Sequence, residues 1–253
     1  MPRFYLAKGN IQNKRASIAG PELEHMKKVL RLKPGECVTL FDDEGWEHEA
    51  IIQSYGTRDA QLEILNSFQP KRESPLDITL AQAIGKGEKM DWVVEKATEL
   101  GVQAVLPFFS SYTVPRLTAD KMQKRRSRWE KIAVSAAKQS GRTRIPNIME
   151  LCGFDSMIQR DWSCELKIVF CPGESVTGLH QLKAGRQHLD SVLLVIGPEG
   201  GFTSEEVEQA SHHGFQTVQL GKRVLRTETA AVGALSIVQF LWGDLGGGGR
   251  GGK

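Results

Sequence analysis

Two glycine-rich segments near the C-terminus carry residue types that can build a ligand pocket. Ile196–Thr203 reads IGPEGGFT, and Leu220–Ala230 reads LGKRVLRTETA. Each segment follows a short apolar run that predicts a strand and leads into a helical pattern, so each places a turn at a strand end. Glycine allows the main chain to approach a ligand closely, with backbone N–H and C=O groups facing it. We therefore expect one pocket built from both segments.

The glycine spacing argues against the common nucleotide-binding loops. No lysine follows Gly197–Gly201 as a phosphate loop requires, and Gly85 and Gly87 lack the third glycine of a dinucleotide fingerprint. Main chain exposed beside apolar side chains suits a ligand with a flat ring and a few polar edges, such as adenosine. Taken alone, two such turns are also common as purely structural turns.

Composition excludes several classes of protein. The 253 residues allow one large domain or a small domain plus a larger one, and 40% hydrophobic with 25% charged residues is ordinary for a globular protein. No apolar run reaches about 18 residues, and the N-terminus lacks the apolar core of a signal peptide, so we expect no membrane span. The four cysteines form no C-x-x-C pair and the six histidines lack the spacing of metal ligands, so we expect no metal site. Reduced thiols of this kind predict a cytoplasmic location.

Positive charge is concentrated in the middle of the chain. Ten basic residues lie from Arg116 to Arg144, against only Asp120 and Glu130, so this segment carries +8 although the whole chain carries +3. A nucleic-acid partner accounts for such a run. A solvated helix face accounts for it as well.

The first part of the chain, residues 1–70, predicts a small antiparallel sheet or barrel. Its clearest strand-like runs are Val38–Phe41, Glu49–Ile52 and Gln61–Leu65. A helix near Pro21–Leu30 interrupts them. The apolar residues expected on one side of this helix are Leu23, Met26, Val29 and Leu30. Residues 71–75 have the composition of a linker.

From residue 76 to 245, strand-like and helical segments alternate, which predicts a mainly parallel sheet. The expected strands are Ile78–Ile84, Val102–Phe108, Leu166–Phe170, Val192–Ile196 and Phe215–Leu220. The expected helices are Met90–Leu100, Thr118–Gln139 and Glu228–Trp242, with a further helix opened by a Thr203–Glu206 capping box. Residues 246–253 are glycine-rich, and we expect them to be disordered.

Five blocks in a fixed order carry a family resemblance. They are Pro2–Tyr5 with His25 and Val29–Arg31, Gly87–Met90, Glu99–Val102, Lys138–Arg142 with Pro146, and the two glycine-rich segments. Over nearly its whole length the chain resembles the RsmE-type 16S ribosomal RNA uridine N3-methyltransferases of the SPOUT superfamily. It departs from the family pattern at Asp43, where glycine is usual, and in its C-terminal tail.

The resemblance implies an α/β protein in two parts. These are an N-terminal PUA-like β-barrel that binds RNA, and a SPOUT α/β domain with a mainly parallel sheet and a deep C-terminal trefoil knot. It also implies a homodimer, with small residues of the last helix at the interface, and S-adenosylmethionine as the cofactor. The cofactor-binding residues it implies are Ile196, Gly197, Pro198, Glu199, Gly200, Gly201, Leu220, Gly221, Val224, Leu225, Arg226, Thr229 and Ala230.

The implied reaction is methylation of N3 of a specific uridine in 16S ribosomal RNA near the decoding site, on the assembled 30S subunit. The uridine must be unpaired or flipped out, and its N3 must lose a proton. Arg226 is our candidate for stabilising or orienting the base, and Glu199 or Glu228 for accepting the proton. The RNA-binding candidates are Arg3, Arg15, Lys28, Arg31, Lys86, Lys89, Arg142 and Arg223.

Alternatives stay open at this stage. A SPOUT enzyme with another RNA target would share the fold and cofactor, and a non-catalytic ribosome assembly factor would retain the RNA surface. A dinucleotide-dependent oxidoreductase is disfavoured by the missing fingerprint. Glu228 also suits the first turn of a helix, where the dipole favours a carboxylate. Arg223 and Arg226 also suit a salt bridge or a surface contact.

Overall fold

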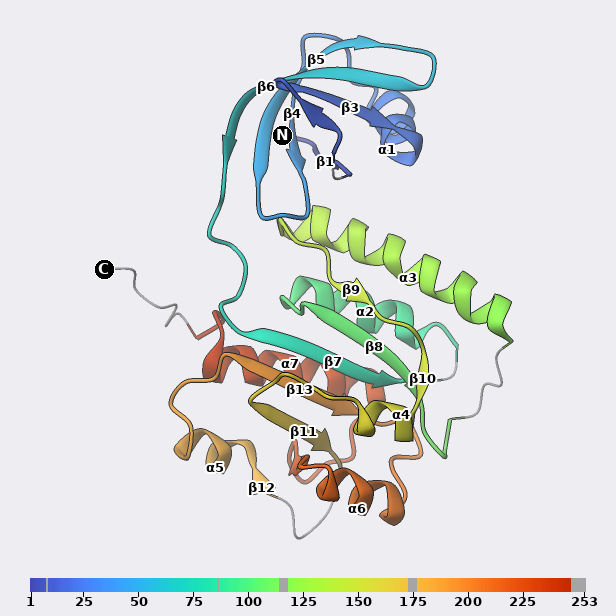
Figure 1. The fold of residues 1–253 in the computed structure, drawn as a ribbon, viewed down its shortest axis with the longest axis vertical. Coiled ribbons are helices and arrows are strands. Elements are labelled where there is room, and N and C mark those ends of the chain that lie inside the picture. The colour runs from blue at the N-terminus through green and yellow to red at the C-terminus, as the bar shows by residue number, and fades with distance from the viewer. Residues whose placement is uncertain (8, 86, 114–117, 173–176, 247–253) are drawn as a thin grey trace. The chain divides into compact units, whose positions relative to one another are not determined.

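The computed structural model describes residues 1–7, 9–85, 87–113, 118–172 and 177–246. The chain forms two compact units (Figure 1). The first comprises Met1–Glu73 together with Ala137–Ile145, and the second comprises Ser74–Ala136 and Pro146–Lys253. The first unit thus takes in a short segment from the middle of the chain that no sequence pattern marks. The proposed disordered tail lies almost entirely outside the described residues.

The first unit contains, within its described residues, a six-stranded sheet in the order β1-β4-β5-β6-β3-β2. Its strands are β1 (Arg3–Tyr5), β2 (Ile11–Gln12), β3 (Arg15–Ala19), β4 (Cys37–Phe41), β5 (Glu47–Tyr55) and β6 (Asp59–Phe68). The three expected strands are confirmed as β4, β5 and β6, and they pair antiparallel, whereas β1 pairs parallel with β4. Alternate residues of these strands, such as Val38 and Leu40, are buried in one apolar core.

The expected helix of this unit is present in a modified form. It begins as α1 (Gly20–Glu24), with Pro21 in its first turn, and continues as a wider π-helical turn, η1 (His25–Val29). Leu23 and Met26 are buried as expected. The expectation for Val29 and Leu30 is wrong, since Val29 is 69% exposed and Leu30 is also exposed. The wider turn changes the 3.6-residue register on which that expectation depended.

The second unit is built, within the described residues, on an eight-stranded sheet. The order of neighbouring strands is β10-β8-β7-β13-β11-β14-β12, and β9 also pairs with β8. The strands are β7 (Asp77–Ala83), β8 (Ala104–Phe109), β9 (Asn147–Ile148), β10 (Cys152–Gly153), β11 (Leu166–Phe170), β12 (Thr177–Gly178), β13 (Ser191–Ile196) and β14 (Gln216–Gln219). Every pair among them is parallel, which confirms the predicted parallel sheet.

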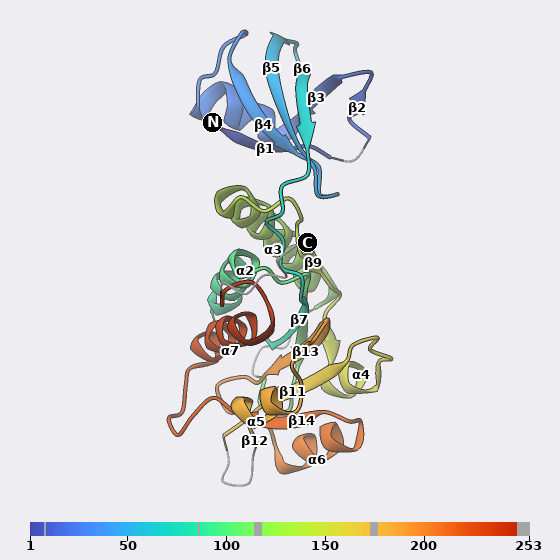
Figure 2. The same ribbon diagram turned by 90° about the vertical axis from the view of Figure 1, so that its left-hand side faces the viewer.

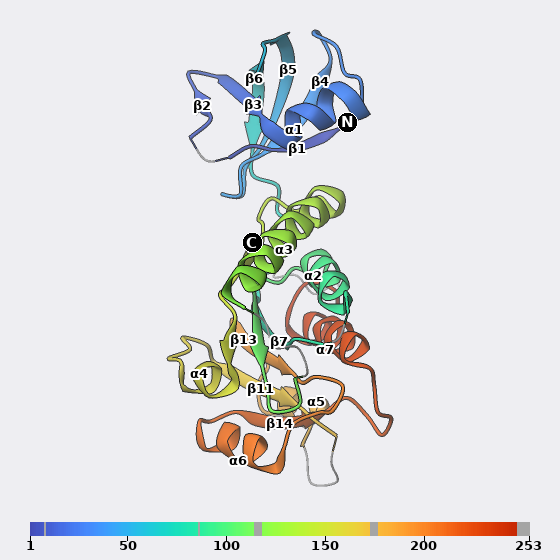
Figure 3. The same cartoon turned by 90° about the vertical axis from the view of Figure 1, so that its right-hand side faces the viewer.

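Helices cover both faces of this sheet. They are α2 (Lys89–Glu99), α4 (Phe154–Gln159), α5 (Leu179–Ala184), α6 (Ser204–His212) and α7 (Thr227–Trp242). A longer helix, α3 (Ala119–Ser140), belongs to this unit as far as Ala136. Helices α2 and α7 pack together on one face, and α4 and α6 lie on the other (Figures 2 and 3). The predicted capping box is confirmed at α6, where Thr203 Oγ1 accepts from the Glu206 N–H at 3.1 Å.

Candidate active site

A cavity of about 230 Å³ lies at the carboxyl ends of β11, β13 and β14, which are neighbours in the sheet. This is the edge at which open parallel α/β sheets bind ligands. The lining residues are Phe170, Cys171, Pro172, Ile196, Gly197, Pro198, Glu199, Gly200, Gly201, Gln219, Leu220, Gly221, Arg223, Val224, Leu225, Thr227 and Ala230. Both glycine-rich segments therefore contribute to a single cavity.

Most of the residues expected to hold a cofactor line this cavity, but two do not. Arg226 and Thr229 are exposed and do not line the cavity. Helix α7 begins at Thr227, between these two residues. Sequence reasoning missed Gln219 and Thr227, and also the end of β11, residues 170–172. The buried run before residue 170 was already a predicted strand. The carboxyl end of this strand lies beside the carboxyl ends of its parallel neighbours. That position could have identified residues 170–172 as part of the site.

The glycines of the two loops are required by the backbone and by close packing. The Gly201 N–H donates to the Pro198 carbonyl at 3.0 Å, closing a turn in which Gly201 has φ +73°. Gly221 has φ +120°. A Cβ on Gly200 would lie 2.9 Å from the Cβ of Tyr112, closer than side-chain carbons approach. The loops therefore present main chain to the cavity where larger residues would not fit.

A buried hydroxyl joins three elements at the cavity. Thr227 Oγ1 donates to the Gly197 carbonyl at 2.6 Å and accepts from Gln82 Nε2 at 2.9 Å. Thr227 and Gln82 are both buried. These bonds connect β7, the loop after β13 and the first residue of α7. The start of the last helix is therefore fixed against the first glycine-rich loop.

Lys89 brings together the two carboxylates that sequence reasoning selected. Its Nζ lies 2.6 Å from Glu199 Oε1 and 3.6 Å from Glu228 Oε2. The hydrogen bond with Glu199 is the main cause of a raised pKa for the Lys89 ammonium. A Cβ on Gly85 would lie 3.0 Å from Glu199 Oε1, so the glycine leaves room for this carboxylate. Lys89, which we expect to contact RNA, lies beside two carboxylates and keeps 31% of its side chain exposed.

Arg3 and Arg142, two further RNA-binding candidates, have structural partners in the first unit. Arg3 Nη2 contacts Glu47 Oε1 at 2.6 Å and donates to the Arg142 carbonyl at 3.1 Å. Arg142 pairs with Glu73 at 2.8 Å, and its side chain is 5% exposed. Arg142 is therefore buried beside Glu73, and Arg3 keeps 14% of its side chain exposed. That these two arginines bind RNA stays a prediction.

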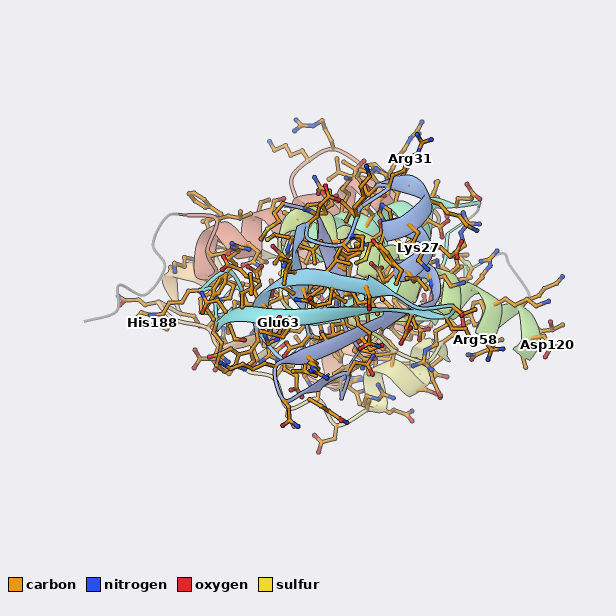
Figure 4. All side chains as sticks on the ribbon, turned by 90° about the horizontal axis from the view of Figure 1, so that it is seen from above. Lys27, Arg31, Arg58, Glu63, Asp120 and His188 are labelled. Carbon is orange, nitrogen blue, oxygen red and sulfur yellow. The ribbon has the colours of Figure 1, made fainter. Side chains whose placement is uncertain are left out.

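The other RNA-binding candidates differ in their surroundings. Arg15 lies exposed on β3, and Arg31 is exposed just after η1 (Figure 4). Lys28 is exposed and pairs with Glu24 at 2.5 Å within the same helical segment. Arg223, expected to meet RNA, lines the cavity. Lys86 lies outside the described residues.

No group of three or more histidine, cysteine, aspartate or glutamate side chains is placed to bind a metal ion among the described residues. In the same ranges, no helix combines the length and the apolar character needed to cross a membrane.

Comparison with known families assigns both parts of the chain. Residues 72–239 match the RNA methyltransferase domain family, and residues 18–65 match the RNA methyltransferase PUA domain family. The second match identifies the sheet of the first unit as PUA-like. The first match covers the sheet, the cavity and both glycine-rich loops.

Individual relatives agree over nearly the whole chain. Ribosomal RNA small subunit methyltransferase E of Bacillus subtilis is 33% identical over 88% of this chain and 89% of its own length. A solved methyltransferase of Legionella pneumophila with bound S-adenosylmethionine is 35% identical, with a TM-score of 0.89 over 96% of this chain and 98% of its own. Ribosomal RNA small subunit methyltransferase E of Neisseria gonorrhoeae, bound to S-adenosyl methionine, is 37% identical, with a TM-score of 0.85 over 96% and 99%.

Proposed function

Since the chain belongs to the ribosomal RNA small subunit methyltransferase E family, we propose that it methylates N3 of a uridine in 16S ribosomal RNA, with S-adenosylmethionine as methyl donor. The observation that carries this proposal is the single cavity formed by two glycine-rich loops at the carboxyl ends of three parallel strands. We place the target near the decoding site of the assembled 30S subunit, in the cytoplasm.

The residues of the cavity fit S-adenosylmethionine. Phe170, Ile196 and Leu220 supply apolar walls for a purine ring, and the glycine turns bring main-chain polar groups beside them. Leu225 and Ala230 extend the apolar surface. The bound cofactor supplies an electrophilic methyl group on a sulfonium. The protein must hold it and present a nucleophilic nitrogen to it.

Uridine N3 becomes that nucleophile only when it loses its proton. Glu199 and Glu228 are the carboxylates beside the cavity, and either serves as the proton acceptor. Deprotonation leaves negative charge on the uracil ring, which a nearby cation stabilises. Arg226 is suited to this role because it is exposed at the start of α7, and no ion pair holds its guanidinium among the described residues.

We also infer that the last helix threads through a loop to form a deep trefoil knot. The support is the position of Thr227, which begins α7 and bonds both to β7 and to the loop after β13. Those elements lie far from it in the sequence, and the bonds fix the segment preceding α7 among them. A knot would make the cavity loops resistant to local opening.

A homodimer is the third inference. One face of α7 leaves Ile237 39% and Phe240 64% exposed, and a Cβ on Gly233 would meet no atom within 4 Å. Together with Ala230, these residues follow a helical spacing of three and four, so they form one small and apolar face. A second copy of the chain would cover it. Replacing Ile237 by Asp should yield a monomer in size-exclusion chromatography with light scattering.

The test of the reaction uses small ribosomal subunits from a strain that lacks this gene. Labelled S-adenosylmethionine and the purified protein are added, and the modified nucleoside is identified by mass spectrometry. We expect 3-methyluridine in 16S ribosomal RNA. Another methylated nucleoside would retain the enzyme class and replace the target. Absence of both transfer and cofactor binding would refute the proposal and favour a ribosome assembly factor.

A further inference from the structure

One face of α3 carries four cations in a regular series. Lys121, Lys124, Arg128 and Lys131 are separated by three, four and three residues, the spacing that places side chains in a row along a helix. All four are exposed. Away from this row, Trp129 is buried, and its Nε1 donates to Asp91 Oδ1 at 2.9 Å. We call this row the α3 cationic stripe.

Three members of the stripe have no protein partner within the described residues. Lys121, Lys124 and Lys131 make no ion pair or hydrogen bond there. Arg128 pairs with Glu88 at 2.9 Å and with Asp91, and its side chain remains 56% exposed. No acid of the described ranges therefore neutralises these three lysine charges.

This arrangement is unfavourable for an isolated helix. Like charges one turn apart repel, as Lys124 and Arg128 do, and as Arg128 and Lys131 do. Lys121 lies in the first turn of α3, where the helix dipole disfavours a cation. By contrast, a lysine on another helix is paired: Lys96 on α2 contacts both Glu95 and Glu99 at 2.8 Å.

On α3 itself, two acids lie near the stripe. Asp120 lies in the first turn (Figure 4), four residues before Lys124, and Glu130 is engaged by Arg126 at 3.2 Å. Two small hydroxyl residues, Ser127 and Ser135, lie among the cations and border the same shallow depression as Lys124 and Lys131. Hydroxyls and ammonium groups are the side chains that commonly contact phosphate oxygens. The surface therefore offers hydroxyl donors and positive charge, and of its four cations only Arg128 is paired with acids among the described residues.

We propose that the α3 cationic stripe docks the phosphate backbone of the RNA that this protein methylates. The identity of the RNA rests on the proposed function. From Lys121 to Lys131 the helix rises about 15 Å at 1.5 Å per residue, the length of a short run of backbone phosphates. Contacts of this kind position an RNA without reading its sequence. The stripe thus orients the substrate, and the cavity loops select and react with the base.

The test is a charge-neutralising triple variant, Lys121→Gln, Lys124→Gln and Lys131→Gln, compared with the unaltered chain. The probe is a fluorescent single-stranded RNA, titrated by anisotropy over a range of salt concentrations. We expect the Kd to rise on the order of tenfold at low salt, and the slope of log K against log salt to flatten by about 2. On small subunits, KM should rise while kcat and S-adenosylmethionine affinity stay unchanged.

The matched control replaces the same three lysines by arginine, which retains the charges and should retain RNA affinity. An unchanged Kd and salt slope in the glutamine variant would overturn the proposal. So would an equal loss in the arginine variant, since charge would then not be the cause. If the unaltered chain binds RNA with the expected salt dependence but produces no 3-methyluridine, the proposed function fails and the stripe stands.

Discussion

The ammonium of Lys89 lies 2.6 Å from Glu199 Oε1, joining the first residue of α2 to the loop after β13. Glu199 lines the cavity, whereas Lys89 does not. The lysine therefore sets the position of a cavity carboxylate from outside the cavity. Glu228 Oε2 lies 3.6 Å from the same ammonium and makes no hydrogen bond among the described residues. One cation thus fixes both carboxylates proposed as proton acceptors.

Replacing Lys89 by Met should lower methyl transfer more than cofactor binding. Without the ammonium, the two carboxylates repel each other and Glu199 loses its orientation. We expect kcat to fall about tenfold, the scale of a misplaced general base, with S-adenosylmethionine affinity changed less than about threefold.

Lys89→Arg is the control, since it retains the positive charge and should recover most of the turnover. Equal losses of cofactor affinity and turnover in the methionine variant would assign Lys89 to loop folding alone. Unchanged turnover in that variant would separate Lys89 from the carboxylate that takes the proton.

Asp43 gives a pH-dependent prediction in the first unit. Burial is the main cause of a raised pKa for this carboxyl, and its Oδ1 accepts from the Ile145 N–H. Because the folded pKa lies above the unfolded one, stability falls as pH rises from about 3.8 through the folded pKa. Asp43→Asn keeps an acceptor and removes the buried charge. Its Tm should exceed that of the unaltered chain at pH 7, and the difference should vanish below pH 3.8.

Asp43→Gly separates the effect of the positive φ at this position from the effect of the hydrogen bond that the carboxylate accepts. Asp43 has φ +65°, a conformation that glycine adopts without strain, but glycine leaves the Ile145 N–H without its acceptor. We expect the asparagine variant to be more stable than the glycine variant at pH 7. Thermal unfolding followed by circular dichroism at several pH values measures both. A lower Tm for the asparagine variant at pH 7 would contradict the argument.

Removal of the Thr227 hydroxyl should destabilise the fold and the cavity together. Thr227→Val keeps the shape but leaves the Gly197 carbonyl and the Gln82 amide with an unmade buried hydrogen bond. The expected cost is about 2 kcal/mol, or a Tm lower by about 5 °C. S-adenosylmethionine affinity, measured by calorimetry, should fall because the first glycine-rich loop loses its anchor. Thr227→Ser retains the hydroxyl and should retain both properties.

The sequence predicts those parts of the molecule whose signals are local. Short apolar runs that alternate with helical patterns predict β7, β8, β11, β13 and β14. Glycine at the strand ends identifies both loops of the cavity. By contrast, β9 and β10 have two residues each, too few for any periodicity. The π-helical turn of η1 also breaks the expected register.

Contacts between residues far apart in the sequence have no local signal. Arg142 reads as a surface cation, and only the fold reveals Glu73 beside it. The same contacts bring residues 137–145 into the first unit. Thr227 reads as a helix-start residue, because its partners Gln82 and Gly197 are distant in the sequence. Residue type therefore predicts the chemistry that a side chain can perform. It does not predict whether a distant residue already holds that side chain in a structural contact.

Arg226 provides the most direct test of the chemistry. It was expected to bind cofactor and to act in catalysis, yet its side chain is exposed and lies outside the cavity lining. A residue so placed can stabilise charge on the uracil without holding the cofactor. Arg226→Ala should therefore reduce kcat by 10²-fold or so, the scale of a lost charge-stabilising group, while the Kd for S-adenosylmethionine changes little. Lys222→Ala is the matched control, because Lys222 is exposed in the same loop and does not line the cavity. Unchanged methylation in the Arg226 variant would remove Arg226 from the mechanism, and a parallel loss in the Lys222 variant would point to a general loss of positive charge in the loop.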